Sequence, residues 1–149
     1  MEILISRLKE WQANSVVFYS TAQGFHCNVE GPLFTQYHSF FGDIYADVYA
    51  TVDTISEWLR KFDVVAPYTL SEFIANNNYG DVQNDSNSPI IMSRQLLDMN
   101  EKMLLDIQTI FNEAIVQNQQ ALANFLAERE DKHKFWSWWL KSSLKSTIN

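Results

Sequence analysis

Apolar residues recur every three or four positions along four long stretches of this chain, which is the spacing of amphipathic helices. Two short polar links and one long connector join the stretches, and the connector lies between the second and the third. The stretches cover residues 2–27, 33–62, 93–116 and 120–144. Amphipathic helices bury their apolar faces against one another, so the pattern predicts an all-α four-helix bundle.

The connector, residues 64–88, is rich in Asn, Ser, Pro and Gly, which are typical of turns and loops. Within it, Leu70–Ile74 could form a short helix capped by Thr69 or Ser71. Short links join antiparallel neighbours, whereas a connector of this length lets the chain cross the bundle from one end to the other. We therefore expect two helical hairpins packed together in one domain that spans residues 1–149.

Composition and charge limit the classes of function. Hydrophobic residues make up 46% of the 149 residues and aromatic residues 14%, which predicts a folded chain with a real core. The net charge of −7 disfavours binding to a phosphate backbone and suits a cationic ligand such as a metal ion. A single cysteine, no apolar leader and no apolar run of membrane-spanning length predict a cytoplasmic protein without a membrane segment.

Two histidines flank the break between the first two stretches. His26 and His38 each lie six residues from Pro32. If the segments fold back as a hairpin, both imidazoles stand roughly 9 Å from the turn, given a rise of about 1.5 Å per residue. One chain could then direct two nitrogen ligands towards one metal ion. Taken alone, a histidine in a helix is more often a surface residue or a satisfied core residue.

Asp53 and Glu57 lie further along the second stretch, spaced i, i+4 and therefore on one helix face. Positions 38 and 53 are separated by about 22 Å of helical rise, whereas ligands of one ion lie within a few ångströms of each other. Two copies paired antiparallel across a twofold axis would bring His38 of one copy to Asp53 and Glu57 of the other. Mixed imidazole and carboxylate ligands suit iron, zinc or manganese. A solvated helix face is the alternative interpretation of the Asp–Glu pair.

Segments 26–34, 37–38 and 53–57 resemble the signature of Dps proteins, the mini-ferritins of starved bacteria. That signature is a His-Trp-Asn-Val-x-Gly-Pro-x-Phe stretch, a Leu-His pair and an Asp-x-x-Ala-Glu-Arg run. The resemblance implies a ferritin-like bundle, a hollow dodecamer and iron-oxidising centres at its twofold interfaces. Fe(II) would be oxidised there, typically by hydrogen peroxide, and ferric oxide would be stored inside, which protects against oxidative stress. The residues that would bind iron, carried over by position, are His26, His38, Asp53 and Glu57.

The chain departs from the usual family pattern at several positions, three of which bear on the chemistry. Gly42 stands where the family usually has an acidic ligand, so the second iron position is expected to be weak or absent. Cys27 replaces the Trp after the first histidine, and Trp58 replaces the Arg of the last run. Cys27 could be oxidised by peroxide, but small buried packing is the favoured interpretation. These departures keep open a second hypothesis, a structural cage that has lost most of the chemistry.

Two further family properties are weighed against the sequence. Many Dps proteins bind DNA through a lysine-rich extension, but few lysines follow the last stretch here, so we expect DNA binding to be weak or absent. A third hypothesis, a DNA-compacting protein, rests on the family alone. Glu128, Glu130 and Asp131 could line a negative pore that admits iron, and a solvated face explains them equally well. Glu130 and His133 also match a ferritin ligand spacing, which we attribute to chance because no second such element is found.

Overall fold

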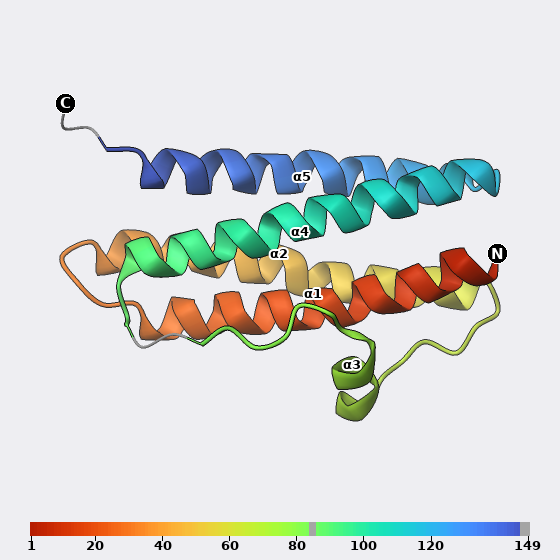
Figure 1. Cartoon of the computed structure of the whole chain (residues 1–149), viewed down its shortest axis with the longest axis horizontal. Helices are drawn as coiled ribbons and strands as arrows, with labels where there is room; N and C mark the ends of the chain where they lie inside the picture. The colour runs from red at the N-terminus through yellow and green to blue at the C-terminus, as the bar shows by residue number, and fades with distance from the viewer. Residues whose placement is uncertain (84–85, 147–149) are drawn as a thin grey trace.

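The computed structural model describes residues 1–83 and 86–146, and within them the chain forms five α helices. Four long helices lie side by side as a bundle, and one short helix stands outside it on the connector (Figure 1). None of the helices within these residues is both long and apolar enough to span a membrane. The all-α bundle with a helix in its connector is confirmed, with helices α1 (Glu2–Asn28), α2 (Phe34–Lys61), α3 (Leu70–Asn76), α4 (Pro89–Val116) and α5 (Gln120–Leu144).

Two antiparallel hairpins build the bundle, as the link lengths predict. α1 turns back into α2 and α4 turns back into α5, while the connector returns along the bundle so that α4 starts at the end where α2 starts (Figure 1). α1 packs against both α2 and α4. Large apolar side chains from these helices fill the interior, among them Trp11, Phe18, Phe41, Met103 and Ile107. This core fixes the helices relative to one another and so fixes the side chains at the α1–α2 turn.

Two helix starts differ from the prediction made from sequence. α2 begins at Phe34, one position after the start of the predicted stretch, and Pro32 lies in the preceding turn. Gly31 has a φ of 125° there, and its carbonyl accepts the backbone N–H of Phe34. α4 begins at Pro89 instead of Ser93. Proline suits the first helical position because the N–H that it lacks would have no intrahelical acceptor there.

Side-chain hydrogen bonds fasten the connector to the bundle. Thr69 caps α3 in a capping box with Glu72, which confirms one of the two predicted caps. Beyond α3, the hydroxyl of Tyr79 donates to Asp106 of α4 at 2.6 Å, and the amide of Asn14 on α1 donates to the same carboxylate at 3.0 Å. Burial raises the pKa of Asp106 despite these two bonds. Tyr79 therefore ties the connector to α4, and the backbone N–H of Asn78 ties it to α1 by donating to Oδ1 of Asn14 at 3.0 Å.

Candidate metal centre

The α1–α2 turn brings His26 and His38 together. His26 lies in the last turn of α1 and His38 lies near the start of α2. Because the helices are antiparallel, the two imidazoles stack, with ring centroids 3.7 Å apart and planes inclined by 19°. Phe34 stacks on His38 at 5.1 Å, and the ring of Tyr45 lies 5.4 Å from that of His26. One chain therefore presents two adjacent imidazoles in an aromatic setting.

Reciprocal hydrogen bonds fix the tautomer of both rings. Nδ1 of His26 lies 2.5 Å from the backbone carbonyl oxygen of His38, and Nδ1 of His38 lies 2.7 Å from the carbonyl oxygen of His26. A carbonyl oxygen can only accept, so each Nδ1 carries its hydrogen and donates it. In the neutral imidazole, Nε2 then has the lone pair. An Nδ1–H held by a carbonyl is the outer support that metal-ligating histidines usually have.

Gly42 provides the space that the His26 ring occupies. A Cβ at position 42 would lie 2.9 Å from Nδ1 and 3.0 Å from Cε1 of His26. Both distances are shorter than van der Waals contact, which is about 3.5–4.0 Å between carbon atoms. The acidic residue that the resemblance leads one to expect at this position would therefore clash with His26 where the ring now stands. Sequence reasoning treated Gly42 only as a missing ligand, although its i+4 spacing from His38 already places it on the histidine face of α2.

The stacked rings do not fit the expectation that both nitrogens bind one ion. A metal lies close to the plane of the imidazole that binds it, at roughly 2.0–2.1 Å from the nitrogen for zinc. Two nearly parallel rings with centroids 3.7 Å apart have planes that do not meet at such a distance. Both imidazoles could bind one shared ion only if one ring turned out of this stack.

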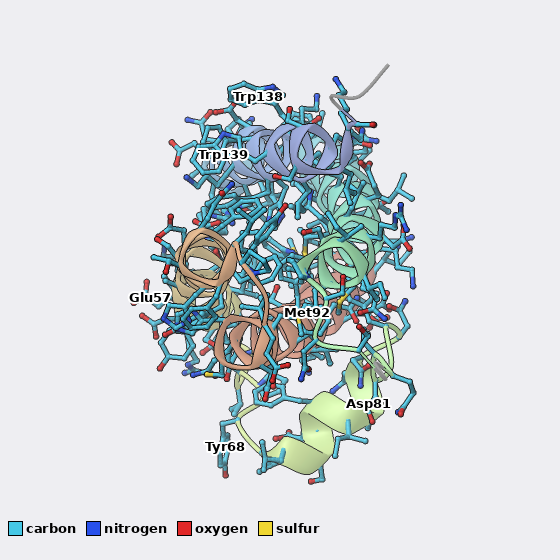
Figure 2. The ribbon with its side chains drawn as sticks, turned by 90° about the vertical axis from the view of Figure 1, so that its left-hand side faces the viewer. Glu57, Tyr68, Asp81, Met92, Trp138 and Trp139 are labelled. Carbon is cyan, nitrogen blue, oxygen red and sulfur yellow. The ribbon has the colours of Figure 1, made fainter. Side chains whose placement is uncertain are left out.

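Asp53 and Glu57 lie away from the histidine pair of the same chain. Both are exposed on α2, and Glu57 projects from the side of α2 that faces away from α4 (Figure 2). Neither carboxylate makes a hydrogen bond or ion pair with another residue in the described ranges. Among the residues that the structure describes, a single chain brings together no group of three or more His, Cys, Asp or Glu that could hold a metal. The four predicted ligands thus divide into a paired set and a separate, unpaired set.

The model of the ferritin-like domain family matches residues 5–147 of the chain. This chain belongs to the ferritin-like domain family. An uncharacterized protein of Haemophilus influenzae is 37% identical to it over 71 residues, which are 48% of this chain and 44% of that protein. The match therefore spans less than half of the length of this curated relative.

Solved structures of Dps proteins share the fold of this ferritin-like chain. The protein of Vibrio cholerae O1, described as a member of a superfamily of ferritin-like diiron-carboxylate proteins, superimposes with a TM-score of 0.91 at 22% identity, over 97% of this chain and 90% of that one. Dps from Thermosynechococcus elongatus gives 0.94 at 20% identity, over 99% and 93% of the two chains. A Dps protein from Bacillus brevis gives 0.91 at 22% identity, over 97% and 96%. The fold is therefore that of Dps proteins.

The acidic residues of α5 in this ferritin-like bundle differ in exposure and in hydrogen bonding. Glu128 and Asp131 are exposed, as a pore or a solvated face requires. Glu130 accepts hydrogen bonds from Gln108 at 3.0 Å and from Lys134 at 2.9 Å, so it is occupied within its own chain. His133 is buried, with 1% of its surface exposed. The side chains of Glu130 and His133 therefore lie in different environments, the first bonded to Gln108 and Lys134 and the second buried. Their spacing nevertheless matches that of a ferritin ligand pair.

Cys27 is exposed, so the interpretation as small buried packing is wrong. The residue follows His26 by about 100° around the last turn of α1. Since His26 faces α2, that rotation carries the thiol out of the helix interface. The prediction failed because free cysteine is among the residue types most often buried, whereas the exposure of Cys27 is set by which face of α1 packs against α2.

Proposed function

We propose that this chain is an iron-sequestering ferroxidase of the Dps type, which oxidises Fe(II) with hydrogen peroxide between two of its copies. The ferric oxide product is stored in a hollow homo-oligomeric shell, a dodecamer by analogy with the family. The observation that carries the proposal is the reciprocal bonding of His26 and His38. It holds both rings in orientation, each with a free Nε2 lone pair, before any metal arrives.

Asp53 and Glu57 of a second copy would complete the site. Both carboxylates are exposed and lie one helical turn apart on the same face of α2. Antiparallel pairing of two α2 helices across a twofold axis generates two equivalent sites, each with imidazoles from one copy and carboxylates from the other. The carboxylates favour Fe(III) over Fe(II) because hard oxygen anions stabilise the higher charge, which assists the oxidation.

Association of copies is also supported by the connector helix. None of the residues of α3 is buried, and its Leu70 and Ile74 are 76% and 73% exposed. Figure 2 shows α3 on the outside of the four-helix bundle, with Tyr68 beside it. Large apolar side chains gathered on a projecting element are typical of surfaces that a partner covers. A second copy of the same chain is the partner that the proposed shell supplies.

The chemistry balances without a further reactant. Each Fe(II) gives up one electron, and hydrogen peroxide accepts two electrons and two protons to become two waters. Two Fe(II) ions, one peroxide and two protons from the solvent therefore give two Fe(III) ions and two waters, with no hydroxyl radical released. The chain contributes ligands that leave coordination positions of the iron open, so that the oxidant can reach it.

Iron-dependent consumption of peroxide by the purified protein tests the proposal. We expect the double variant His26→Ala/His38→Ala to lose most of the rate, because both nitrogen donors are gone. Glu30→Gln is the matched control, since Glu30 is an exposed carboxylate in the same turn that belongs to neither ligand set. A double variant that is as fast as the wild type would place the reaction elsewhere in the molecule.

Gly42 favours a second candidate function, a cage of the same fold with little ferroxidase activity. The glycine removes the acidic ligand that the family usually has there, and the His26 ring fills its place. An assembled shell that shows no anomalous scattering at its twofold interfaces after an iron soak would support this alternative. A shell with iron bound there would argue against it.

The remaining expectations concern location, nucleic acid and iron uptake. We propose that the protein acts in the cytoplasm and that iron enters through pores near Glu128 and Asp131, with Glu130 tied to its own chain. With a net charge of −7, DNA binding should be weak or absent. Retardation of DNA in a gel at physiological salt would restore the DNA-compacting hypothesis.

A further inference from the structure

The bundle interior contains a network of polar side chains that the proposed iron site does not use. Arg129 of α5 donates through Nη1 and Nη2 to the two carboxylate oxygens of Asp47 on α2, each at 2.8 Å. The same Nη2 lies 3.1 Å from Nε2 of His133, one turn further along α5. Trp136 donates its indole N–H to Asp47 at 2.8 Å. One guanidinium is therefore shared between a carboxylate and an imidazole.

Asn100 of α4 fixes the tautomer of that imidazole. The amide nitrogen of Asn100 donates to the backbone carbonyl of His133 at 2.8 Å and to Oγ of Ser137 at 2.7 Å. Its oxygen therefore faces Nδ1 of His133, 2.7 Å away, and accepts the hydrogen of that nitrogen. Nε2 then has a lone pair, which accepts from Arg129. Burial and the charge of Arg129 lower the pKa of His133 to about 3, so the ring is neutral.

Arg129 occupies the place that a cation would take between these donors. A neutral imidazole with its Nδ1–H held by a carbonyl, opposite a carboxylate that is itself hydrogen-bonded, is a donor set that suits a divalent transition metal. Nε of Arg129 is buried without a hydrogen-bond partner in the described part of the chain. The guanidinium therefore donates hydrogen bonds to Asp47 and His133 through its Nη atoms, while its own Nε–H is left without an acceptor.

An opening to the surface lies beside this network. A hollow of about 340 Å³ between α2 and α5 is lined by Asp47, Thr51, Glu128 and Arg129 among others. The side chains of Asp47 and Arg129 retain 19% and 11% of their exposure. A small hydrated cation could therefore reach the carboxylate from outside without unfolding of the bundle.

We propose that Asp47 and His133 form a divalent-cation site inside the helix bundle, and that the chain fills this site with its own Arg129 guanidinium. Arg129 is then the residue that keeps transition metals out of the bundle interior. The inference is independent of the proposed function, since none of its residues belongs to the intersubunit site. Removal of the guanidinium would leave the carboxylate and the imidazole lone pair without their shared cation, and a metal ion would restore the lost interaction.

The test replaces Arg129 by alanine in a background with His26→Ala and His38→Ala, so that the histidines at the α1–α2 turn bind no metal. Zn²⁺ is titrated by calorimetry, and Co²⁺ is added to detect the absorption bands of nitrogen and oxygen coordination. We expect Arg129→Ala to bind Zn²⁺ roughly tenfold more tightly than the background or better, at one ion per chain, and to melt at a higher temperature when Zn²⁺ is present. Arg129→Lys is the matched control, because it keeps a cation in the site and should gain no affinity.

Further variants decide how the result is interpreted. The gain should disappear when His133→Ala is added to Arg129→Ala. A gain that survives this addition, or equal Zn²⁺ affinity with and without Arg129, would overturn the proposal. If Arg129→Ala unfolds in the absence of metal, Arg129→Gln is measured beside it, and refolding of either variant on addition of Zn²⁺ supports the site. Variants that stay unfolded in Zn²⁺ count against it.

Discussion

A methyl group at position 42 should destabilise the protein, although alanine is normally the better helix residue. The Cβ of Gly42→Ala would lie 2.9 Å from Nδ1 of His26, whose hydrogen bond to the carbonyl of His38 holds the ring in place. Overpacking of this kind costs about 1–3 kcal/mol, and loss of the hydrogen bond costs about 0.5–1.5 kcal/mol. Helix propensity returns only about 0.5–1 kcal/mol. We expect a net loss of about 0.5–4 kcal/mol in the free energy of unfolding, centred near 2 kcal/mol.

Gly24→Ala is the matched control, since Gly24 also lies inside a helix and its Cβ would have no atom within 4 Å. Helix propensity alone then applies, and the variant should gain about 0.5–1 kcal/mol. Urea unfolding of both variants against the wild type gives the two free energies. Titration with Zn²⁺, which has no redox chemistry, gives a second readout: affinity at the histidine pair should fall in Gly42→Ala and stay unchanged in Gly24→Ala.

Equal stabilisation of the two glycine variants would refute this reasoning. It would mean that the His26 ring does not stand against α2 in solution, and the reciprocal bonding with His38 would then be lost as a basis for the metal centre. A Gly42→Ala variant that is destabilised but binds Zn²⁺ as tightly as the wild type would contradict the claim that the contact with Gly42 orients His26 for metal binding. The contact would then contribute to packing alone.

Three further predictions concern the bundle and its connector. The pKa of His133 falls from 6.5 to about 3 on folding. Below pH 6.5 the unfolded chain therefore binds a proton that the folded chain does not. The free energy of unfolding should then fall by up to about 1.4 kcal/mol per pH unit as the pH drops. His133→Gln should flatten that slope between pH 6.5 and 5 in urea titrations. Tyr79→Phe removes the hydroxyl bond to Asp106 and should cost about 1.5–3 kcal/mol, whereas Tyr68→Phe, at an exposed ring, should change stability by less than about 0.5 kcal/mol. Thr69→Ala should cost about 1 kcal/mol and increase hydrogen exchange in α3.

The periodicity of apolar residues was sufficient to predict the helices and their topology, because burial of one face decides where a long amphipathic segment packs. The start of α4 was predicted too late, since Ile90 and Ile91 are exposed and the periodic burial begins only at Met92. The start of α2 was predicted one residue early, because Leu33 is the N-cap residue that borders the helix. Local composition cannot separate these cases.

The candidate site was predictable only in part, for a different reason. Equal spacing from the turn brought His26 and His38 to one height, but ring stacking and the contact with Gly42 depend on distances of a few tenths of an ångström. The network of Asp47 and Arg129 was missed because polar residues at helical spacing usually indicate a solvated face. Which polar residues are drawn inside is decided by partners on other helices, and no spacing within one segment reveals them.

Co-assembly of two complementary variants tests most directly whether the iron centre forms between copies. One chain carries His26→Ala/His38→Ala and the other Asp53→Asn/Glu57→Gln, with a different tag on each, and each is expected to be inactive alone. If the donors come from different copies, mixed pairs regain one of their two sites, and random pairing restores about a quarter of the wild-type peroxide consumption. If co-assembled shells carrying both tags show no recovery, the donors do not meet across an interface and the proposed centre is wrong.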